Sequence, residues 1–456
     1  MGYEPESENR GANNVLHGWS LHCSVTAVTQ TINFNKSLSQ GLFVESGLPR
    51  GAGRSFGDVS LPDRGAALFL DTGTQRAHVR LNPENGVAEC SAAASLEDVL
   101  RETVPKGWVL PVVPGASGIT IGGAIAADAH GKNHFQKGSI AEHLLQISLI
   151  TPSGTVITAS RETNSDVFWA TVGGLGLTGI IVEASIALER ISSIRIRQSQ
   201  RRFSTVGEML EIVESEKKSC EFLLGTVRGD FGPGHSWEGS VVIADHVDNG
   251  DQAEIHAYPR RGHVTVPAFF AALPISGLST WALNRAIRAR IRYFSGKEVD
   301  LDRFFFPQDA LGSWNRLFGS TGFIDYQCCI PIDNAPDFLN DLHKLLNNNS
   351  MKCFLVAIKR FKGSENLNPL TFALDGISVA FDMPIRSNTL ANLGELDRLA
   401  IQCGGRVNLI KDARLPRANF LQMYPRVNEW LKIKRQLDPN DSIRSKLSTR
   451  LGLTEL

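Results

Sequence analysis

The sequence of 456 residues lacks the features that mark membrane-spanning, secreted and nucleic-acid-binding proteins. It contains no run of about 18 apolar residues, so no transmembrane helix is expected. Residues 1–14 are polar and acidic and hold no apolar core, which argues against a secretory signal. Lys and Arg together number 47, as do Asp and Glu, so the net charge is zero and no positive field attracts nucleic acid. We therefore expect a cytoplasmic protein without a nucleic-acid partner.

Cysteine is also scarce, and its spacing argues against a disulfide framework or a zinc site. The count of seven is odd and no Cys-x-x-Cys pair occurs. The adjacent Cys328 and Cys329 would point to opposite faces of a strand, so they are not expected to pair. We predict no bound metal and interpret the cysteines as small buried side chains in a reducing compartment. They stand at positions 23, 90, 220, 328, 329, 353 and 403.

Glycine, by contrast, is abundant at 42 residues, and three glycine-rich segments precede residue 180. They are Arg50–Asp58, Pro114–Asn133 and Thr171–Gly179. Glycines permit positive φ angles and let several backbone N–H groups converge on an anion such as a pyrophosphate. One such loop alone is more often a tight turn. Three together predict a large dinucleotide that lies across this part of the chain.

The third segment also matches the Gly-x-Gly-x-x-Gly pattern of NAD-binding proteins, at Gly174, Gly176 and Gly179. That fingerprint follows a strand, opens a helix and places an acidic residue about 20 positions later. Here a run of strand-forming residues, Ile180–Leu188, follows at once. We therefore reject a nicotinamide nucleotide as the ligand of this segment.

The order of predicted elements favours an α+β fold with at least two domains, because strands and helices do not alternate regularly. Short strands and glycine-rich turns occupy the chain to about residue 195, and longer helices and strands follow to residue 405. The expected strands are Ala66–Leu70, Ile180–Leu188 and Phe354–Lys359, with a hairpin across Pro152–Gly154. The expected helices are one that opens at the Ser95–Asp98 capping box, Asp337–Leu346 and Asn428–Leu437.

Five segments carry a resemblance to a known family: GAGRSFGD (51–58), GGAIAADAHGKNH (122–134), FWATVGGLGLTGII (168–181), GFIDYQCCIP (322–331) and MYPRVNEW (423–430). The chain resembles the vanillyl-alcohol-oxidase superfamily of PCMH-type FAD-binding enzymes. Within that superfamily it is similar to the decaprenylphosphoryl-β-D-ribose 2′-oxidase family. Members of that family catalyse the oxidative half of an epimerisation that makes the arabinose donor for cell-wall arabinan. The similarity extends from Leu16 to the C-terminus.

The resemblance implies a two-domain α+β architecture. Residues 1–196 would form the FAD-binding domain and residues 197–405 an α+β substrate-binding domain with an antiparallel sheet. Residues 406–456 would return to the FAD domain. Covalent members of the superfamily carry histidine where Arg54 stands, so the FAD is expected to be noncovalent. The implied FAD-binding residues are Gly53, Arg54, Ser55, Phe56, Gly57, Asp58, Gly115, Ala116, Gly118, Thr120, Gly122, Gly123, Ala126, Ala127, His130, Asn133, Gly179, Ile181 and Asn408.

The resemblance also implies the catalytic and substrate-binding groups. Lys411 matches the family's active-site lysine, and His130 is its implied catalytic companion. Asp382 is a weaker candidate for orienting a neighbour. The ordinary alternatives are a surface lysine for Lys411, a packing histidine for His130 and a structural ion pair for Arg54. The implied substrate-binding residues are Lys132, Gln327, Asp325, Ser378 and Phe56.

This sequence departs from the family at positions that line the substrate. Ala380 replaces a cysteine, Ser378 an asparagine, Asn408 a tyrosine, Asp325 a glutamine and Phe56 a tyrosine. The lost hydroxyl groups and the gained carboxylate change the hydrogen bonds that the pocket offers. The resemblance therefore supports sugar oxidation more strongly than it supports one particular sugar.

We predict FAD-dependent oxidation of a secondary sugar hydroxyl to a ketone, with the 2′-hydroxyl of a polyprenylphosphoryl ribose as the expected substrate. The alternatives are an oxidase of a soluble polyol or aldonolactone and a flavin-binding protein without activity. The resemblance further implies an NAD(P)H-dependent keto-sugar reductase as partner and oxygen or a quinone as electron acceptor.

A basic and aromatic stretch suggests peripheral contact with the inner face of the membrane. No acidic residue occurs between His263 and Lys297. Basic side chains beside apolar ones suit a lipid phosphate and its chain, although a solvated helix face is the simpler reading. The residues concerned are Arg285, Arg288, Arg290, Arg292, Lys297, Phe269, Phe270, Phe304, Phe305 and Phe306.

Overall fold

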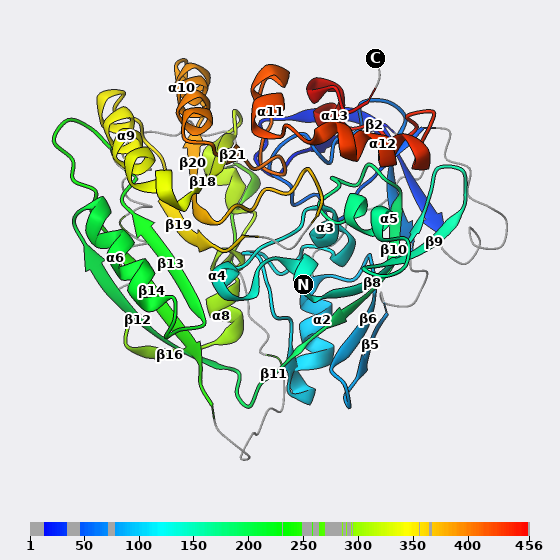
Figure 1. Cartoon of the computed structure of the whole chain (residues 1–456), viewed down its shortest axis with the longest axis horizontal. Coiled ribbons are helices and arrows are strands. Elements are labelled where there is room, and N and C mark those ends of the chain that lie inside the picture. The colour runs from blue at the N-terminus through cyan, green and yellow to red at the C-terminus, as the bar shows by residue number, and fades with distance from the viewer. Residues whose placement is uncertain are drawn as a thin grey trace.

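Three main β-sheets and the helices that cover them form the protein, which confirms the α+β class (Figure 1). The computed structural model describes residues 13–33, 46–71, 78–229, 231–248, 264–269, 295–354, 356–363 and 367–454, together with Tyr258, Arg285, Ala289 and Tyr293.

The N-terminal part holds two of these sheets. The four-stranded sheet has the order β1-β2-β4-β3, in which β2 and β3 both pair in parallel with β4. Its strands are β1 (Asn13–His17), β2 (Ser24–Asn33), β3 (Gly47–Pro49) and β4 (Ala66–Asp71). The five-stranded sheet is antiparallel in the order β5-β6-β10-β8-β9. Its strands are β5 (Val79–Asn82), β6 (Val87–Ser91), β8 (Leu144–Ile150), β9 (Val156–Ser160) and β10 (Ile180–Ala187).

Several local predictions are confirmed in this region. Strands β4 and β10 lie where expected, and β8 and β9 form the hairpin across Pro152–Gly154. Helix α2 (Leu96–Thr103) begins at a capping box, in which Ser95 Oγ accepts from the Asp98 N–H and the Asp98 carboxylate accepts from the Ser95 N–H. The other helices are α3 (Ile121–Ala126), α4 (His134–Lys137) and α5 (Ser165–Thr171).

The third sheet has eight antiparallel strands in the order β16-β12-β14-β13-β19-β20-β18-β21. Helices α6 (Val206–Glu216), α9 (Ala335–Asn348) and α10 (Thr389–Gln402) cover one face and bury the larger core against it (Figure 1). The strands are β12 (Arg195–Phe203), β13 (Phe222–Val227), β14 (Gly239–His246), β16 (Lys297–Asp300), β18 (Phe323–Pro331), β19 (Val356–Phe361), β20 (Gly376–Pro384) and β21 (Arg406–Val407).

Side-chain alternation gives the two faces of this sheet different roles. Cys328 packs into the core beneath the helices, whereas Cys329 lies with Phe361 on the opposite side. The prediction that the two thiols point apart is therefore confirmed. Polar positions of β18, β19 and β20 share the face of Cys329, which is the face turned toward the N-terminal part of the chain.

The C-terminal segment packs against the first glycine-rich loop. Trp430 Nε1 donates to the carbonyl of Ala170 at 2.9 Å, and Arg450 forms ion pairs with Asp58 and Asp412, both at 2.9 Å. These C-terminal helices lie along the top of Figure 1, in orange and red. They are α11 (Arg417–Met423), α12 (Val427–Leu437) and α13 (Lys446–Leu451).

Short elements complete the described part of the chain. They are β7 (Trp108–Val109), β11 (Glu189–Arg190), β15 (Val264–Thr265), β17 (Leu311–Gly312), α8 (Leu301–Phe305) and the 3-10 turns Val104–Lys106, Ile140–His143, Pro307–Ala310, Trp314–Phe318 and Ile332–Asn334.

The structure corrects one part of the expected lipid-binding stretch. Phe304, Phe305 and Phe306 are at most 7% exposed and belong to a hydrophobic core, so they form no surface for a lipid chain. Among the described residues, no helix has both the length and the apolar character to cross a bilayer. Phe270, Arg288, Arg290 and Arg292 lie outside the described residues.

The contact between Gly57 and Asp412 leaves no room for a side chain. A Cβ atom on Gly57 would lie 1.8 Å from the Asp412 carbonyl oxygen. We expect Gly57→Ala to lower the free energy of unfolding by about 1–3 kcal/mol, because the backbone must shift to relieve the overlap. Urea denaturation measures this change.

Gly394→Ala is the matched control, since Gly394 lies within helix α10 and its Cβ would meet nothing within 4 Å. It should raise stability by about 0.5–1 kcal/mol. Equal effects of the two substitutions would contradict the packing role of Gly57.

Candidate active site

The first two glycine-rich loops lie against each other, and their glycines divide into two kinds. A Cβ on Gly51 would lie 2.3 Å from Thr120 Oγ1, so that glycine is required by packing between the loops. A Cβ on Gly115 would meet nothing nearer than Gln308 Oε1 at 3.8 Å, and one on Gly118 would meet only the Arg54 guanidinium, at 3.3 Å or more. Gly115 and Gly118 therefore face the ends of two long side chains and are not packed against backbone, which suits a nucleotide-binding loop.

Arg54, in the first loop, reaches the second loop, where its guanidinium lies beside Gly118. Its guanidinium also lies 4.2 Å from the centroid of the Trp19 ring. Thr120 caps helix α3 by accepting from the Gly123 N–H at 3.3 Å, and the third segment packs behind α3 through the Leu175 N–H, which donates to the Ala126 carbonyl. All three glycine-rich segments therefore meet around α3.

Lys411 joins the first glycine-rich loop to the eight-stranded sheet. Its Nζ lies 2.5 Å from Asp325 Oδ2 on β18 and 5.1 Å from the centroid of the Phe56 ring. Asp325 is only 5% exposed, so this ion pair is shielded from water. Lys411 is thus not a surface lysine, and three of the predicted residues meet at one point.

A second carboxyl group lies opposite Asp325. Asp382 on β20 is its direct partner in the strand register, and Asp382 Oδ1 is buried without a hydrogen-bond partner. Burial, followed by the nearby Asp325 carboxylate, raises the pKa of Asp382 well above its usual value, while Lys411 opposes the shift. The protonated form of Asp382 is therefore favoured beside Lys411 and Asp325.

Gln327 organises the polar groups next along the strand. Its Nε2 donates to Ser378 Oγ at 2.8 Å and lies 3.2 Å from His130 Nε2. Its Oε1 accepts from Asn408 Nδ2 at 3.0 Å. The structure thus brings together four of the predicted residues, and buries Gln327 to 1% exposure.

Lys359 on β19 belongs to the same cluster, although no sequence pattern singled it out. Its Nζ lies 3.3 Å from His130 Nδ1. Burial, then Lys411 and Lys132, lower the pKa of Lys359 to about 7. The pKa of His130 lies well below its usual value, first because of burial and then because of Lys359. The sequence offered one signal for Lys359: the predicted strand Phe354–Lys359 holds a single lysine among apolar residues.

Other predicted residues serve structure at the edge of the site. Lys132 Nζ donates to the carbonyls of Phe304 and Phe305, both at 2.9 Å, and burial lowers its pKa to about 7. Asn133 Nδ2 donates to the Pro111 carbonyl at 2.8 Å, and Asp58 pairs with Arg450.

The remaining predicted residues lie in the glycine-rich segments and at the start of β10. Gly53 has φ +63° in the first loop, beside Ser55. Gly122 packs on Ala92, and a Cβ on Gly122 would lie 3.0 Å from the Ala92 Cβ. Ala127 caps the end of α3, and Gly179 and Ile181 flank the start of β10, where Ile181 is 8% exposed. Ala116 lies between Gly115 and Gly118 in the second loop.

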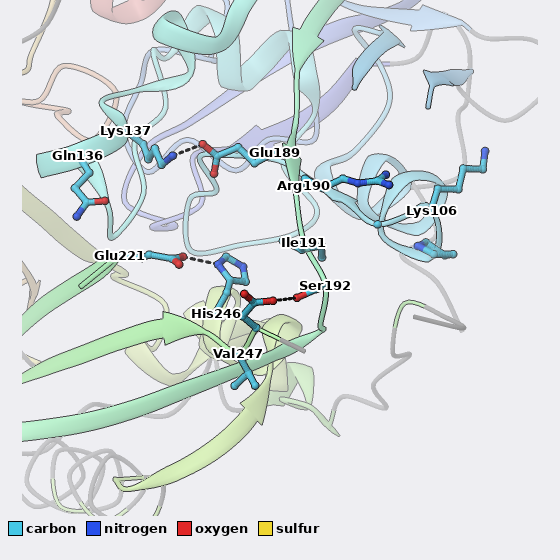
Figure 2. Close-up of a pocket in the computed structure, with 13 residues that line it drawn as sticks. Lys106, Gln136, Lys137, Glu189, Arg190, Ile191, Ser192, Glu221, His246 and Val247 are labelled. Atoms are coloured by element: carbon cyan, nitrogen blue, oxygen red, sulfur yellow. Dashed lines mark hydrogen bonds and ion pairs between the residues drawn. The ribbon is translucent and has the colours of Figure 1, made fainter. Parts of the chain in front are cut away.

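A separate pocket lies away from this cluster, near β11 and the end of β14 (Figure 2). Lys137 pairs with Glu189 there, and Glu221 lies 2.5 Å from His246 Nδ1. These charges already have partners, and none of the residues around Lys411 lines the pocket. We therefore place the chemistry at the Lys411 cluster.

Comparisons with known proteins agree with this geometry. Residues 45–160 match the family model described as FAD binding domain. The chain is 29% identical over 415 residues to decaprenylphosphoryl-beta-D-ribose oxidase of Mycolicibacterium smegmatis, covering 89% of each protein. It is 22% identical to L-gulonolactone oxidase of Bos taurus over 85% of this chain and 86% of the relative. Cytokinin dehydrogenase 7 of Oryza sativa matches 40% of this chain and 36% of the relative at 30% identity.

These matches and the site define an FAD-dependent oxidoreductase that acts on CH–OH groups. The chain is an FAD flavoprotein with a PCMH-type FAD-binding domain, and it resembles decaprenylphosphoryl-β-D-ribose oxidase. The residues at Gly115 and Gly118 fit the pyrophosphate of FAD, because neither glycine is packed against backbone and the Arg54 guanidinium lies beside Gly118. Arg54 is placed to offer charge-assisted hydrogen bonds to a phosphate.

The flavin should be released when the protein is denatured. The resemblance implies noncovalent binding, because Arg54 stands where covalent members of that superfamily carry histidine, and a guanidinium does not form that bond. Acid precipitation of the yellow holoprotein should leave all flavin absorbance in the supernatant. Flavin that stays on the washed precipitate would disprove noncovalent binding.

Proposed function

We propose that this protein oxidises the 2′-hydroxyl of a polyprenylphosphoryl ribose to a keto sugar. The observation that supports the proposal most directly is the position of Lys411, between the first glycine-rich loop and the polar face of the eight-stranded sheet. The similarity to decaprenylphosphoryl-beta-D-ribose oxidase over 89% of both chains supports the same substrate class.

Oxidation of an alcohol must remove a hydride from carbon and a proton from oxygen. Bound FAD supplies the hydride acceptor. The residues of this chain have the second task and must also hold the sugar. Lys411 donates toward a developing alkoxide, and the Asp325 carboxylate accepts hydrogen bonds from sugar hydroxyls. Phe56 offers an apolar surface beside both.

From the chemistry of the product and the substrate we infer a partner enzyme, an electron acceptor and contact with a membrane. A keto sugar becomes the epimeric alcohol only when a second enzyme returns a hydride, so we infer an NAD(P)H-dependent reductase. Oxygen or a quinone would reoxidise the flavin. A polyprenyl chain resides in a bilayer, so we infer that the enzyme meets its substrate at the cytoplasmic face of the membrane.

A soluble polyol or aldonolactone is the second candidate substrate. Asp325 favours it, because a carboxylate binds neighbouring hydroxyls well and repels a phosphate. The similarity to L-gulonolactone oxidase is weaker, at 22% identity, so this candidate ranks second.

Anaerobic flavin reduction separates the candidates. The holoprotein is mixed without oxygen with polyprenylphosphoryl ribose of different lipid lengths, with free ribitol and with aldonolactones, and the flavin absorbance is followed. We expect bleaching by the lipid-linked ribose and a rate that depends on the lipid. Bleaching by the free polyols alone would favour the second candidate, and no bleaching by any sugar would overturn the proposal.

Lys411→Met should retain FAD and lose flavin reduction. Removing the ammonium group takes away charge stabilisation in a buried site, which typically costs about 100-fold or more in rate. Stopped-flow reduction and the flavin content of the purified protein measure the two effects. Lys434→Met provides no control, because Lys434 forms a buried pair with Asp438. The exposed Lys344→Met is the control and should reduce at the rate of the unmodified protein.

A further inference from the structure

A chain of hydrogen bonds runs in one direction through the site, starting at a backbone N–H. The Ile410 N–H donates to Asn408 Oδ1 at 3.1 Å, which leaves Asn408 Nδ2 to donate to Gln327 Oε1 at 3.0 Å. Gln327 therefore presents its Nε2 hydrogens to Ser378 Oγ and His130 Nε2. Because a backbone N–H can only donate, the direction of the whole chain is fixed at its start.

This direction determines the state of His130. An amide nitrogen does not accept, so His130 Nε2 must be the acceptor in its 3.2 Å contact with Gln327 Nε2. A neutral imidazole carries one proton, which then lies on Nδ1. Nδ1 faces Lys359 Nζ at 3.3 Å, so its proton lies on the side of Lys359 and of the Gly131 backbone, with which the ring also forms a hydrogen bond.

Beside this N–H, Lys359 can bond to His130 only as an acceptor, and an ammonium group has no lone pair with which to accept. The amine is the form that completes the chain. The charged groups around Lys359 favour this form on balance. Lys411 and Lys132 repel an added proton and the site is buried, while Asp325 alone opposes them. His134, on helix α4, is held neutral because burial lowers its pKa to about 3.

We propose that Lys359 is held as an uncharged amine by the chain through Asn408, Gln327 and His130, and that it takes up the proton of the substrate hydroxyl. The role in catalysis rests on the proposed function. As the substrate O–H bond breaks, its proton bonds to the Lys359 lone pair, which leaves the long contact with His130. The electron pair left on oxygen would form the carbonyl bond as the same carbon gives up its hydride, and bound FAD would supply the hydride acceptor. The lysinium then returns its proton to water.

The direction of the chain is measured without any substrate. In holoprotein labelled with ¹⁵N-histidine, the signals of His130 are identified among 11 histidines by their loss in His130→Asn. We expect the Nδ1–H tautomer at pH 8. Gln327→Glu replaces the donor by a carboxylate oxygen and should switch His130 to Nε2–H, whereas Ser378→Ala should leave the tautomer unchanged. The Nε2–H tautomer in the unmodified protein would overturn the proposal.

The proton acceptor is tested by the pH dependence of anaerobic flavin reduction. The rate should rise with pH through about 7, because the acceptor is active only after it loses its proton. Gln327→Glu should move this rise upward by a pH unit or more and lower the rate at pH 7 about tenfold. Lys359→Met should abolish the rise and slow reduction at least 100-fold while FAD stays bound.

Lys359→Arg keeps a cation that does not lose its proton, so it should be as slow as Lys359→Met. Reduction by Lys359→Arg at the unmodified rate would overturn the role of Lys359. If no sugar reduced the flavin of the unmodified protein, the proposed function would fail and with it the proton transfer. The tautomer of His130 would still decide whether Lys359 is an uncharged amine.

Discussion

The ion pair between Lys411 and Asp325 connects the two halves of the site. Lys411 belongs to the C-terminal segment, and the turn that carries it packs on Gly57 of the first glycine-rich loop. Asp325 belongs to the eight-stranded sheet, and their atoms meet at 2.5 Å with little solvent access. Because a buried charge without a partner is strongly unfavourable, each half of the site needs the other. The Arg450 pairs with Asp58 and Asp412 hold the same turn from its far side.

The glycine-rich loops show why sequence reasoning succeeded for the cofactor. The spacing of the glycines shows where no side chain shields the backbone, and this can be seen in the sequence without knowledge of the fold. The sequence did not separate the glycines that packing requires from Gly115 and Gly118, which are not packed against backbone. Gly51 and Gly57 are of the first kind, because Thr120 and Asp412 approach them across the fold. Those contacts join distant segments, and only the tertiary structure reveals them.

The local elements were predictable for a related reason. The capping box of α2, the β8–β9 hairpin and helices α9 and α12 depend on neighbours in sequence. The sheet order does not, since β18 lies between β20 and β21, which follow it by about 50 and 80 residues. Lys359 was missed because its surroundings depend on this sheet order. Side-chain alternation in β19 places Lys359 on the face opposite the helix-covered core, where a lysine normally faces water. In this fold that face is covered by the segment that carries His130.

The departures from the family acquire a common physical meaning in the structure. Lys132, Lys359 and Lys411 influence one another in a buried space, and three positive charges there would repel strongly. A glutamine at position 325 would leave Lys411 without the carboxylate that now pairs with it. Asn408, in place of a tyrosine, gives Gln327 a donor whose direction is set by the backbone, because its own oxygen accepts from Ile410. A tyrosine hydroxyl rotates and both donates and accepts, so it would impose no such direction. The substituted positions therefore set the charge and the proton positions of the lysine cluster, while the glycine-rich loops keep the pattern on which the resemblance rests.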